Sequence, residues 1–292
     1  MTFIKPMECT PVDRVPDDPE KWLYEVKLDG YRCCAEVRKG KSYLYSRYGN
    51  SWPERFPAIH AALAGIPFDV VLDGEIVAVD WRGRPSFQEL QNWQNTRHQI
   101  VLYAFDVLER EGRDLRRVPL EQRKSELEDV ARFFREPVRL VTTLDASLSK
   151  LIPQMRKLGL EGIIAKRRNS RYESGRRSTS WVKHRFNLIE EFVVGGYIPE
   201  DDTFGRLLIG VWEDDKLKFI KKLKNGFSGP SKKEVFHAIR PLKVRKCPFV
   251  NPDPEFVHEA VWVRPVRVVE VQFVEWTTSG KLRHASFRRL VG

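Results

Sequence analysis

Lys27-Leu28-Asp29-Gly30-Tyr31-Arg32, a K-x-D-G-x-R string, decides how the rest of this chain is interpreted. It follows an apolar-rich approach, Trp22-Leu23-Tyr24-Glu25-Val26. A lysine can act as a nitrogen nucleophile when neighbouring charge or burial lowers its pKa, and an arginine can hold phosphate. A Lys-Asp-Gly turn between two strands is also ordinary hairpin chemistry. The string therefore gains its meaning from the segments that follow it.

Four further segments follow in one fixed order. They are Asp73-Gly74-Glu75 within an apolar run, Tyr103-Ala104-Phe105-Asp106-Val107-Leu108, Leu160-Glu161-Gly162-Ile163-Ile164-Ala165-Lys166, and Trp181-Val182-Lys183-His184-Arg185. Together with the lysine string they resemble the covalent nucleotidyltransferase superfamily, and most closely the ATP-dependent DNA ligases of bacterial end joining. Phe87-Gln88-x-Leu90-Gln91-Asn92 also resembles a DNA-ligase feature rather than one of capping enzymes. The resemblance covers nearly the whole chain.

The resemblance implies an α+β fold with two domains. Residues 1–188 would form the nucleotidyltransferase (adenylation) domain, ATP-grasp-like, with antiparallel sheets and helices. In residues 189–292, short strands with one helix fit an OB-fold barrel. Alternating and β-branched patterns predict strands at 23–27, 31–38, 42–46, 70–79, 100–108, 192–197, 206–212, 216–221, 261–263 and 267–276. Helices are expected at 87–93, 120–134, 148–158 and 232–239.

Composition agrees with a nucleic-acid partner. Lys+Arg 51 against Asp+Glu 40 gives a net charge of +11, which favours a polyanion, although a merely soluble basic protein would show the same balance. Four cysteines without C-x-x-C spacing argue against zinc and for a reducing compartment. The sequence shows no apolar leader and no stretch long enough to span a membrane, so we expect a cytoplasmic protein. We further expect it to associate with the nucleoid, as a DNA-binding protein, and to be a monomer.

The reaction implied by the resemblance explains the choice of residues. Lys27 would attack the α-phosphorus of ATP and store the activation as lysyl-AMP. The AMP would pass to the 5′-phosphate of nicked or broken double-stranded DNA, and the 3′-hydroxyl would displace it. A free lysine has a pKa of about 10.4, so the nucleophile needs positive charge nearby, from Lys183, Arg185 and a metal.

Carboxylates are expected to serve a divalent metal, Mg²⁺ or Mn²⁺. The resemblance assigns Glu161 to this metal and Glu75 to the ribose or the metal. Both lie in or at the end of apolar strands, where an uncompensated charge is costly to bury. The alternative is that they are solvated glutamates at strand edges. Asp29 is a further carboxylate near Lys27, or a structural residue of the turn.

The same resemblance predicts the ATP contacts. Phe105 would stack on one face of adenine, Ile164 would cover the other, and Glu25 would reach the exocyclic amine. On the sequence alone, Phe105 would be a core residue. Arg32 and Arg47 would contact phosphate, Arg47 that of the 5′ end in the break. The alternative for Arg47 is a solvated hairpin residue.

Two departures from the family pattern stand out. The Trp-x-Lys-x-Lys pattern ends in Arg185, which keeps the charge but changes the geometry. Gly280-Lys281-Leu282-Arg283-His284-Ala285-Ser286-Phe287 resembles the approach to an Arg-x-Asp-Lys element, yet no Asp-Lys pair follows. Either Arg283, Arg288 or Arg289 substitutes for it, or self-adenylylation is slow.

No additional N-terminal DNA-binding domain is expected, because the lysine string lies so near the start of the chain. DNA would then be held by basic surfaces, including those around 167–177 and 221–224. The loop 167–180 is rich in Ser, Arg and Gly, and is expected to be exposed and mobile. Two other functions remain open: an RNA ligase or GTP-dependent capping-type enzyme, and a non-catalytic basic OB-fold protein that binds nucleic acid.

Overall fold

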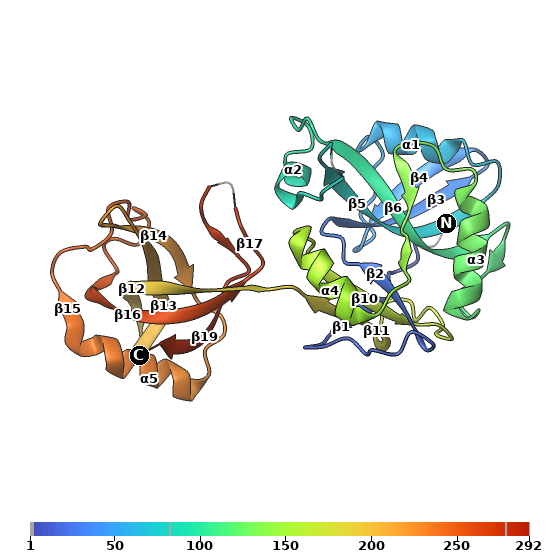
Figure 1. Cartoon of the computed structure of the whole chain (residues 1–292). Coiled ribbons are helices and arrows are strands. Elements are labelled where there is room, and N and C mark those ends of the chain that lie inside the picture. The colour runs from blue at the N-terminus through green and yellow to red at the C-terminus, as the bar shows by residue number, and fades with distance from the viewer. Residues whose placement is uncertain (1–2, 82, 278, 292) are drawn as a thin grey trace. The chain divides into compact units, whose positions relative to one another are not determined.

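The computed structural model describes residues 3–81, 83–277 and 279–291. The chain divides into two compact units, Met1–Phe186 and Asn187–Gly292 (Figure 1). Each unit has its own hydrophobic core. Most strand pairings are antiparallel, and helices are few, which is the α+β composition predicted from the sequence.

A five-stranded sheet forms one part of the first unit, with the order β1-β11-β10-β2-β9. Its strands are β1 (Glu8–Pro11), β2 (Trp22–Val26), β9 (Thr143–Leu144), β10 (Gly162–Arg167) and β11 (Arg177–Arg185). The pairing of β1 with β11 is parallel, and the other pairings are antiparallel. The segment next to the lysine string, β2, thus lies between β9 and β10, two strands that come far later in the chain.

A six-stranded sheet forms the other part, with the order β4-β3-β5-β6-β7 and β8 beside β6. Its strands are β3 (Tyr31–Arg38), β4 (Lys41–Ser46), β5 (Val70–Val79), β6 (Gln99–Arg110), β7 (Arg113–Asp114) and β8 (Val138–Leu140). Gly74 lies in the middle of β5, where a Cβ would come within 2.8 Å of the Tyr103 carbonyl oxygen. The glycine therefore permits the close approach of β5 and β6.

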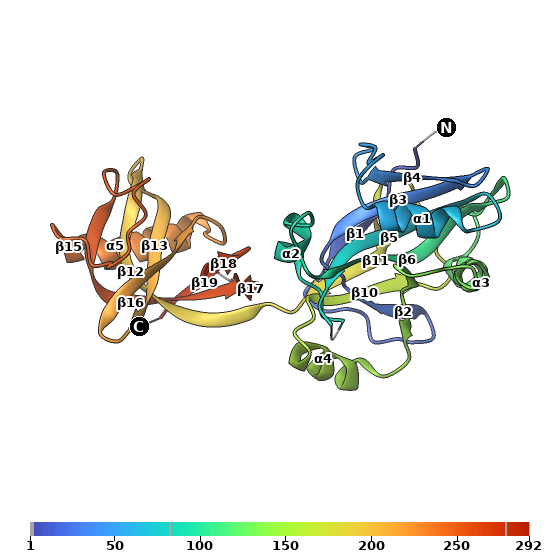
Figure 2. The same ribbon diagram turned by 90° about the horizontal axis from the view of Figure 1, so that it is seen from above.

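Four helices are described in the first unit: α1 (Pro57–Ala64), α2 (Phe87–Gln91), α3 (Leu120–Ala131) and α4 (Leu148–Lys157). The last three confirm helices predicted from the sequence, although each is shorter than expected. The sequence analysis missed α1, which begins with Pro57 and buries Ile59 and Leu63. Figure 2 shows α4 beside β10 and away from the six-stranded sheet.

One hydrophobic cluster joins the two sheets. It contains Leu23 and Trp181 from the five-stranded sheet and Val71 and Phe105 from the six-stranded sheet. Burial of large apolar side chains from both sheets stabilises their packing, at roughly 25 cal/mol per Å² removed from water. This packing brings side chains of β2 and β11 against side chains of β5 and β6.

One residue of the segment between β10 and β11 departs from the prediction of an exposed loop. Most arginines of this loop are exposed as predicted, but Tyr172 is only 4% exposed. Its hydroxyl donates to Asp73 at 2.5 Å and accepts from the Met7 N–H at 3.0 Å. The buried Tyr172 therefore anchors the loop to β5 and to the N-terminal segment. The Ser, Arg and Gly content of the loop, from which its exposure was predicted, gives no sign of this contact.

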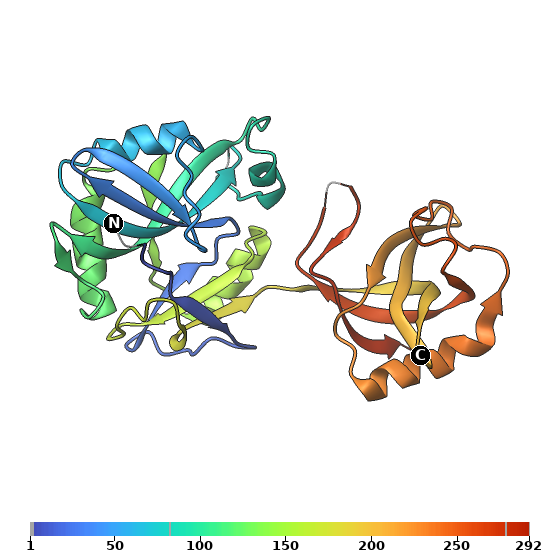
Figure 3. The same ribbon diagram turned by 180° about the vertical axis from the view of Figure 1, so that it is seen from behind.

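The second unit is a curved sheet with the order β14-β13-β12-β16-β15, with β19 beside β16 and a separate β17-β18 pair. Its strands are β12 (Leu188–Glu200), β13 (Thr203–Glu213), β14 (Lys216–Leu223), β15 (Lys243–Val244), β16 (Val261–Phe273), β17 (Glu275–Trp276), β18 (Leu282–Arg283) and β19 (Ser286–Val291). Helix α5 (Gly229–Ile239) is followed by the short η1 (Arg240–Leu242), and Figure 3 shows this orange helical segment beside the strands of the second unit. Val235 and Ile239 of α5 are buried in the core of this unit.

Two strands predicted separately, at 261–263 and 267–276, are largely one strand, β16. Pro265, which cannot donate a backbone hydrogen bond, lies between the two predicted segments. In the structure, the pairing of β12 with β16 shifts register between Val194 and Gly196, whose partners are Arg267 and Trp262. The proline falls in this bulge, so the strand continues past it.

Candidate active site

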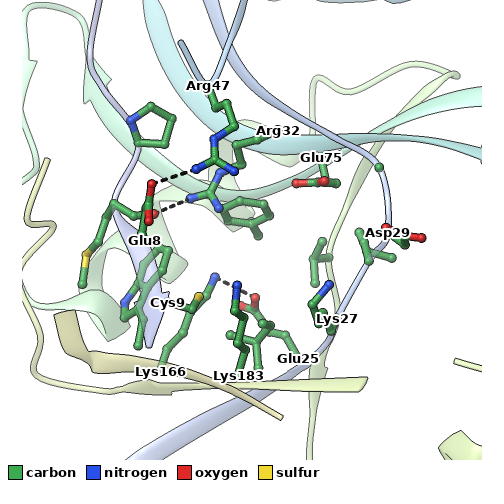
Figure 4. A pocket seen from close by; sticks show the side chains of 18 of the residues that line it. Glu8, Cys9, Glu25, Lys27, Asp29, Arg32, Arg47, Glu75, Lys166 and Lys183 are labelled. Atoms are coloured by element: carbon green, nitrogen blue, oxygen red, sulfur yellow. Dashed lines mark hydrogen bonds and ion pairs between the residues drawn. The ribbon is translucent and has the colours of Figure 1, made fainter. Parts of the chain in front are cut away.

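A cavity of about 360 Å³ lies in the first unit where the two sheets meet (Figure 4). Nine of the ten residues expected at the site line it: Glu25, Lys27, Arg32, Arg47, Glu75, Phe105, Ile164, Lys183 and Arg185. The tenth, Glu161, does not line the cavity but is bound to two residues that do. The fold thus brings together side chains from six separate segments of the chain.

Strand pairing explains one wall of the cavity. Ile164 of β10 is opposite Glu25 of β2 on one side and Lys183 of β11 on the other. Side chains in one cross-strand row point to the same face of a sheet. Lys27 follows Glu25 by two positions, and its N–H donates to the Gly162 carbonyl at 2.9 Å, so its side chain continues on that face.

Lys27, Glu161 and Arg185 form a charged cluster. The Lys27 ammonium donates to Glu161 Oε2, and Arg185 Nε forms an ion pair with Oε1 at 3.0 Å. Gly162 follows the glutamate, and a Cβ there would meet the His184 carbonyl oxygen at 2.2 Å. The Glu-Gly pair of the motif therefore has a steric reason, since only glycine allows β10 and β11 to close around the carboxylate.

Arg32 has a structural partner as well as a place in the cavity wall. Its Nε and Nη2 donate to Asp73 at 2.6 and 2.7 Å, and Nη2 also donates to the Met7 carbonyl at 3.1 Å. Its guanidinium lies 4.6 Å from the centre of the Phe105 ring. Asp73 is fully buried, so this bidentate pair compensates a charge that would otherwise be costly in the interior.

Glu25 is held between two lysines that the sequence analysis did not assign. Lys124 of α3 contacts one carboxylate oxygen, and Lys166 Nζ lies 2.7 Å from the other. Burial would raise the pKa of Glu25, but the two ammonium groups outweigh it and hold that pKa below its usual value. Burial lowers the pKa of Lys166, whose ammonium also faces the rings of Phe105 and Trp181 at 4.3 and 4.2 Å.

Lys166 stands in one of the quoted motifs, so its position was visible in the sequence. Lys124 belongs to no motif. A buried lysine in an otherwise amphipathic helix is a weak signal, and only the packing of α3 against the sheets brings it to the site.

Glu8 is a further residue that sequence reasoning missed. Its carboxylate accepts from Arg47 Nη2 at 2.9 Å (Figure 4), and also from Arg177 Nη2 at 2.7 Å. The hydrogen bond from Arg177, reinforced by the charge of Arg47, lowers the pKa of Glu8. Arg47 and Arg177 thus converge on one anion at the mouth of the cavity.

Glu75 is the carboxylate with the least favourable surroundings. Burial raises its pKa to about 7, despite the opposing charges of Arg32 and Lys27, and Asp29 adds to the rise. Lys183, on the other wall, has a lowered pKa through burial and through the charges of Arg185 and Lys27. Burial thus disfavours the charged form of Glu75, while basic side chains such as Lys183 and Arg185 also line the cavity, an arrangement that suits a polyphosphate with a cation.

Comparison with known proteins identifies the family. The model of the ATP dependent DNA ligase domain matches residues 6–185, and that of the ATP dependent DNA ligase C terminal region matches residues 200–291. The chain belongs to the ATP-dependent DNA ligase family. Its fold is accordingly the nucleotidyltransferase domain followed by an OB-fold domain, as predicted. Among the described residues, no helix is both long and apolar enough to cross a membrane.

Relatives of this ligase-family chain include multifunctional end-joining proteins. It is 40% identical over 281 residues to the multifunctional non-homologous end joining protein LigD of Pseudomonas aeruginosa, covering 92% of this chain and 33% of that protein. The Mycobacterium tuberculosis LigD is 34% identical over 277 residues, covering 92% and 36%. The chain thus spans about a third of the length of these curated relatives.

Solved structures agree with the sequence relatives. The ligase domain of M. tuberculosis LigD matches with a TM-score of 0.62 and 33% identity, over 99% of this chain and 95% of that one. A mycobacterial DNA ligase D complexed with ATP and MES matches with a TM-score of 0.61 and 33% identity, over 99% and 95%.

Proposed function

We propose that this chain is an ATP-dependent DNA ligase in which Lys27 carries the AMP. The observation that carries the proposal is the contact between the Lys27 amine and the Glu161 carboxylate beside a cavity lined by the other expected residues. The family assignment supports the reaction class. The LigD relatives support a role in repairing DNA breaks by end joining.

In the first step, a neutral Lys27 Nζ attacks the α-phosphorus of ATP. A nitrogen–phosphorus bond forms, and the bond from the α-phosphorus to the pyrophosphate oxygen breaks. Before the attack, the lysine must lose a proton, and Glu161 already accepts a hydrogen bond from it. Glu161 is thus placed to take that proton. In the following steps the DNA 5′-phosphate takes the AMP from the lysine, and the 3′-hydroxyl displaces the AMP.

The remaining roles follow the positions of the side chains. Phe105 and Ile164 offer apolar surfaces for the two faces of adenine, and Glu25 offers carboxylate oxygens for its exocyclic amine. Lys183 and Arg185 extend positive charge toward the phosphates, and Arg32 does so with the part of its guanidinium not bound to Asp73.

Arg47 lies at the cavity mouth and would bind the 5′-phosphate of the break. The substrate would be nicked or broken double-stranded DNA, bound by a monomer. Arg283, Arg288 and Arg289 of the second unit form ion pairs with Glu275 or Glu270. That one of these arginines assists the first step remains a prediction.

A divalent cation, Mg²⁺ or Mn²⁺, fits the donor chemistry of the site. Glu75 is a partly buried carboxylate whose charged form is disfavoured, and a cation beside it would relieve that cost. Glu75 and Glu161 would hold the ion. Phosphate oxygens and water would supply its remaining ligands, since the described residues contain no cluster of three or more acidic, His or Cys side chains that could hold it alone. The ion would neutralise phosphate charge.

Mass spectrometry after incubation with ATP tests the proposal. We expect a mass increase matching one AMP, lost in Lys27→Ala, with subsequent sealing of nicked DNA by the wild type only. An AMP adduct on the Lys27→Ala protein would refute the assignment of the nucleophile. Labelling by GTP, or sealing of RNA but not DNA, would instead indicate a capping-type enzyme or an RNA ligase. Nucleic-acid binding without any adduct would indicate a non-catalytic protein.

A further inference from the structure

Glu8 occupies the two arginines at the mouth of the cavity. Residue 8 of β1 is opposite Arg177 in the pairing of β1 with β11. Its N–H donates to the Arg176 carbonyl at 2.8 Å, so strand pairing fixes the backbone from which the carboxylate projects. Each carboxylate oxygen then accepts from one arginine, Oε1 from Arg47 and Oε2 from Arg177.

The arginine pair is open to a solution anion. The Arg47 side chain is 51% exposed and that of Arg177 is 54% exposed, against 35% for Glu8. Within the described ranges, Glu8 is the one carboxylate that pairs with either arginine. Two guanidinium groups repel each other unless an anion lies between them. Their convergence is therefore the geometry of an anion site, and the protein's own carboxylate fills it.

We propose that Glu8 is a built-in competitor for the DNA phosphate at Arg47 and Arg177. This inference rests on the proposed function, in which Arg47 binds the 5′-phosphate of a break. In the free protein, Glu8 holds the two arginines in place. A terminal phosphate displaces the carboxylate, and the carboxylate returns once the phosphate has become part of a continuous strand.

Charge explains why the exchange runs in both directions. A terminal phosphate monoester carries about −1.5 to −2 at neutral pH and offers three acceptor oxygens, more than a carboxylate with one charge and two oxygens. The sealed phosphodiester carries a single charge and has two free oxygens, so it has no such advantage over Glu8. Glu8 thus gives way to the terminal phosphate when the substrate binds, and it displaces the sealed strand from the two arginines when the product leaves.

Binding of DNA by Glu8→Gln tests the proposal without catalysis. Affinities are measured in EDTA and without ATP for two nicked duplexes that differ only in a 5′-phosphate or a 5′-hydroxyl. Removing the competitor should strengthen binding of the 5′-phosphate nick by about fivefold, the upper end for a partly exposed ion pair. Binding of the 5′-hydroxyl nick should change little, since that DNA has no phosphate to gain from the freed arginines.

Glu126→Gln is the matched control. Glu126 also pairs with two arginines, Arg110 and Arg113, but does not line the cavity, so the same loss of charge should leave both affinities unchanged. The competitor role is overturned if Glu8→Gln strengthens both nicks equally, leaves both unchanged or weakens the 5′-phosphate nick. A wild type that binds both nicks equally would refute the 5′-phosphate site itself, and the inference with it. Lysyl-AMP formation is measured separately, so that outcome is distinguishable from failure of the ligase assignment.

Discussion

Lys27 and Glu161 are 134 positions apart in the chain, yet their side chains form one ion pair. In the proposed reaction, attachment of AMP to Lys27 would remove the ammonium charge of the lysine. Glu161 would then lose one of its two partners and keep Arg185. The charge of this cluster would therefore change during the reaction.

Substitution of Glu161 separates this chemical role from a structural one. Glu161→Gln keeps the size of the side chain but removes the base, so lysyl-AMP formation should slow by about 100-fold, the lower range for general base catalysis. The melting temperature should fall little. Single-turnover labelling with ATP and thermal unfolding are the two measurements, with the exposed Glu128→Gln as control. Global unfolding of Glu161→Gln would show that its role is structural.

Glu75 predicts a pH dependence of stability. Its pKa is about 7 in the folded protein, against an ordinary value of 4.5. Between these two values the folded state keeps a proton that the unfolded state has released, so stability decreases as pH rises from about 4.5 to 7. The glutamine in Glu75→Gln does not titrate, so this variant should lose less stability than the wild type between pH 4.5 and 7.

The measurement is the melting temperature in EDTA from pH 5 to 8 for the wild type, Glu75→Gln and the control Glu128→Gln. The control should follow the wild type. Parallel curves for the wild type and Glu75→Gln would mean that Glu75 is ionised throughout, contrary to the burial that the fold imposes on it.

At the scale of elements, the loop from 168 to 176 holds together two parts of the first unit, strand β5 and the N-terminal segment, through a buried side chain. The Tyr172 hydroxyl links Asp73 of β5 to the Met7 backbone, and Asp73 in turn fixes Arg32 in the cavity wall. The loop is therefore a support of the active site, and its basic side chains are carried on an anchored backbone.

Removing that hydroxyl should weaken the whole first unit. Tyr172→Phe leaves the buried Asp73 with one partner fewer, which should cost about 1–3 kcal/mol of unfolding free energy. Urea denaturation measures this cost. Tyr48→Phe, at a side chain 74% exposed, should cost almost nothing. An unaltered unfolding curve for Tyr172→Phe would show that the buried hydrogen bond does not anchor the loop.

At the scale of the whole molecule, the net charge of +11 predicts salt-dependent binding of DNA. Basic residues of the second unit, Lys221 and Lys224, adjoin the end of β14. If both contact phosphate, replacing them with alanine should reduce the slope of log K against log salt by about 2, since each contact contributes about 0.9.

Fluorescence anisotropy with nicked duplex DNA at several salt concentrations measures this slope. Lys216→Ala with Lys218→Ala is a control of equal charge on the same strand, where Lys218 pairs with Glu213. An equal loss of slope in both double variants would indicate a general effect of charge without a specific contact by Lys221 and Lys224.

Much of the site could be predicted because its residue types stand in short, ordered motifs. The glycines at 74 and 162 have steric reasons that act locally between paired strands, and the alternation of strand residues predicts that Glu25 and Lys27 share one face. Helix patterns were clear where an amphipathic stretch followed a Pro or Ser. The helix at Pro57–Ala64 was not predicted, since its eight residues are mostly apolar and show little helical periodicity.

The sequence by itself determined the family and predicted Lys27 as the nucleophile, because the residue types of the motifs stand at fixed spacing along the chain. The tertiary structure alone decided that Lys124 holds Glu25, that Tyr172 holds Asp73 and that Glu8 occupies Arg47 and Arg177. Each of these contacts joins residues far apart in the chain, and no helix or strand periodicity relates their positions. Such partners are selected by which surfaces pack together, and packing depends on the whole fold rather than on any local pattern.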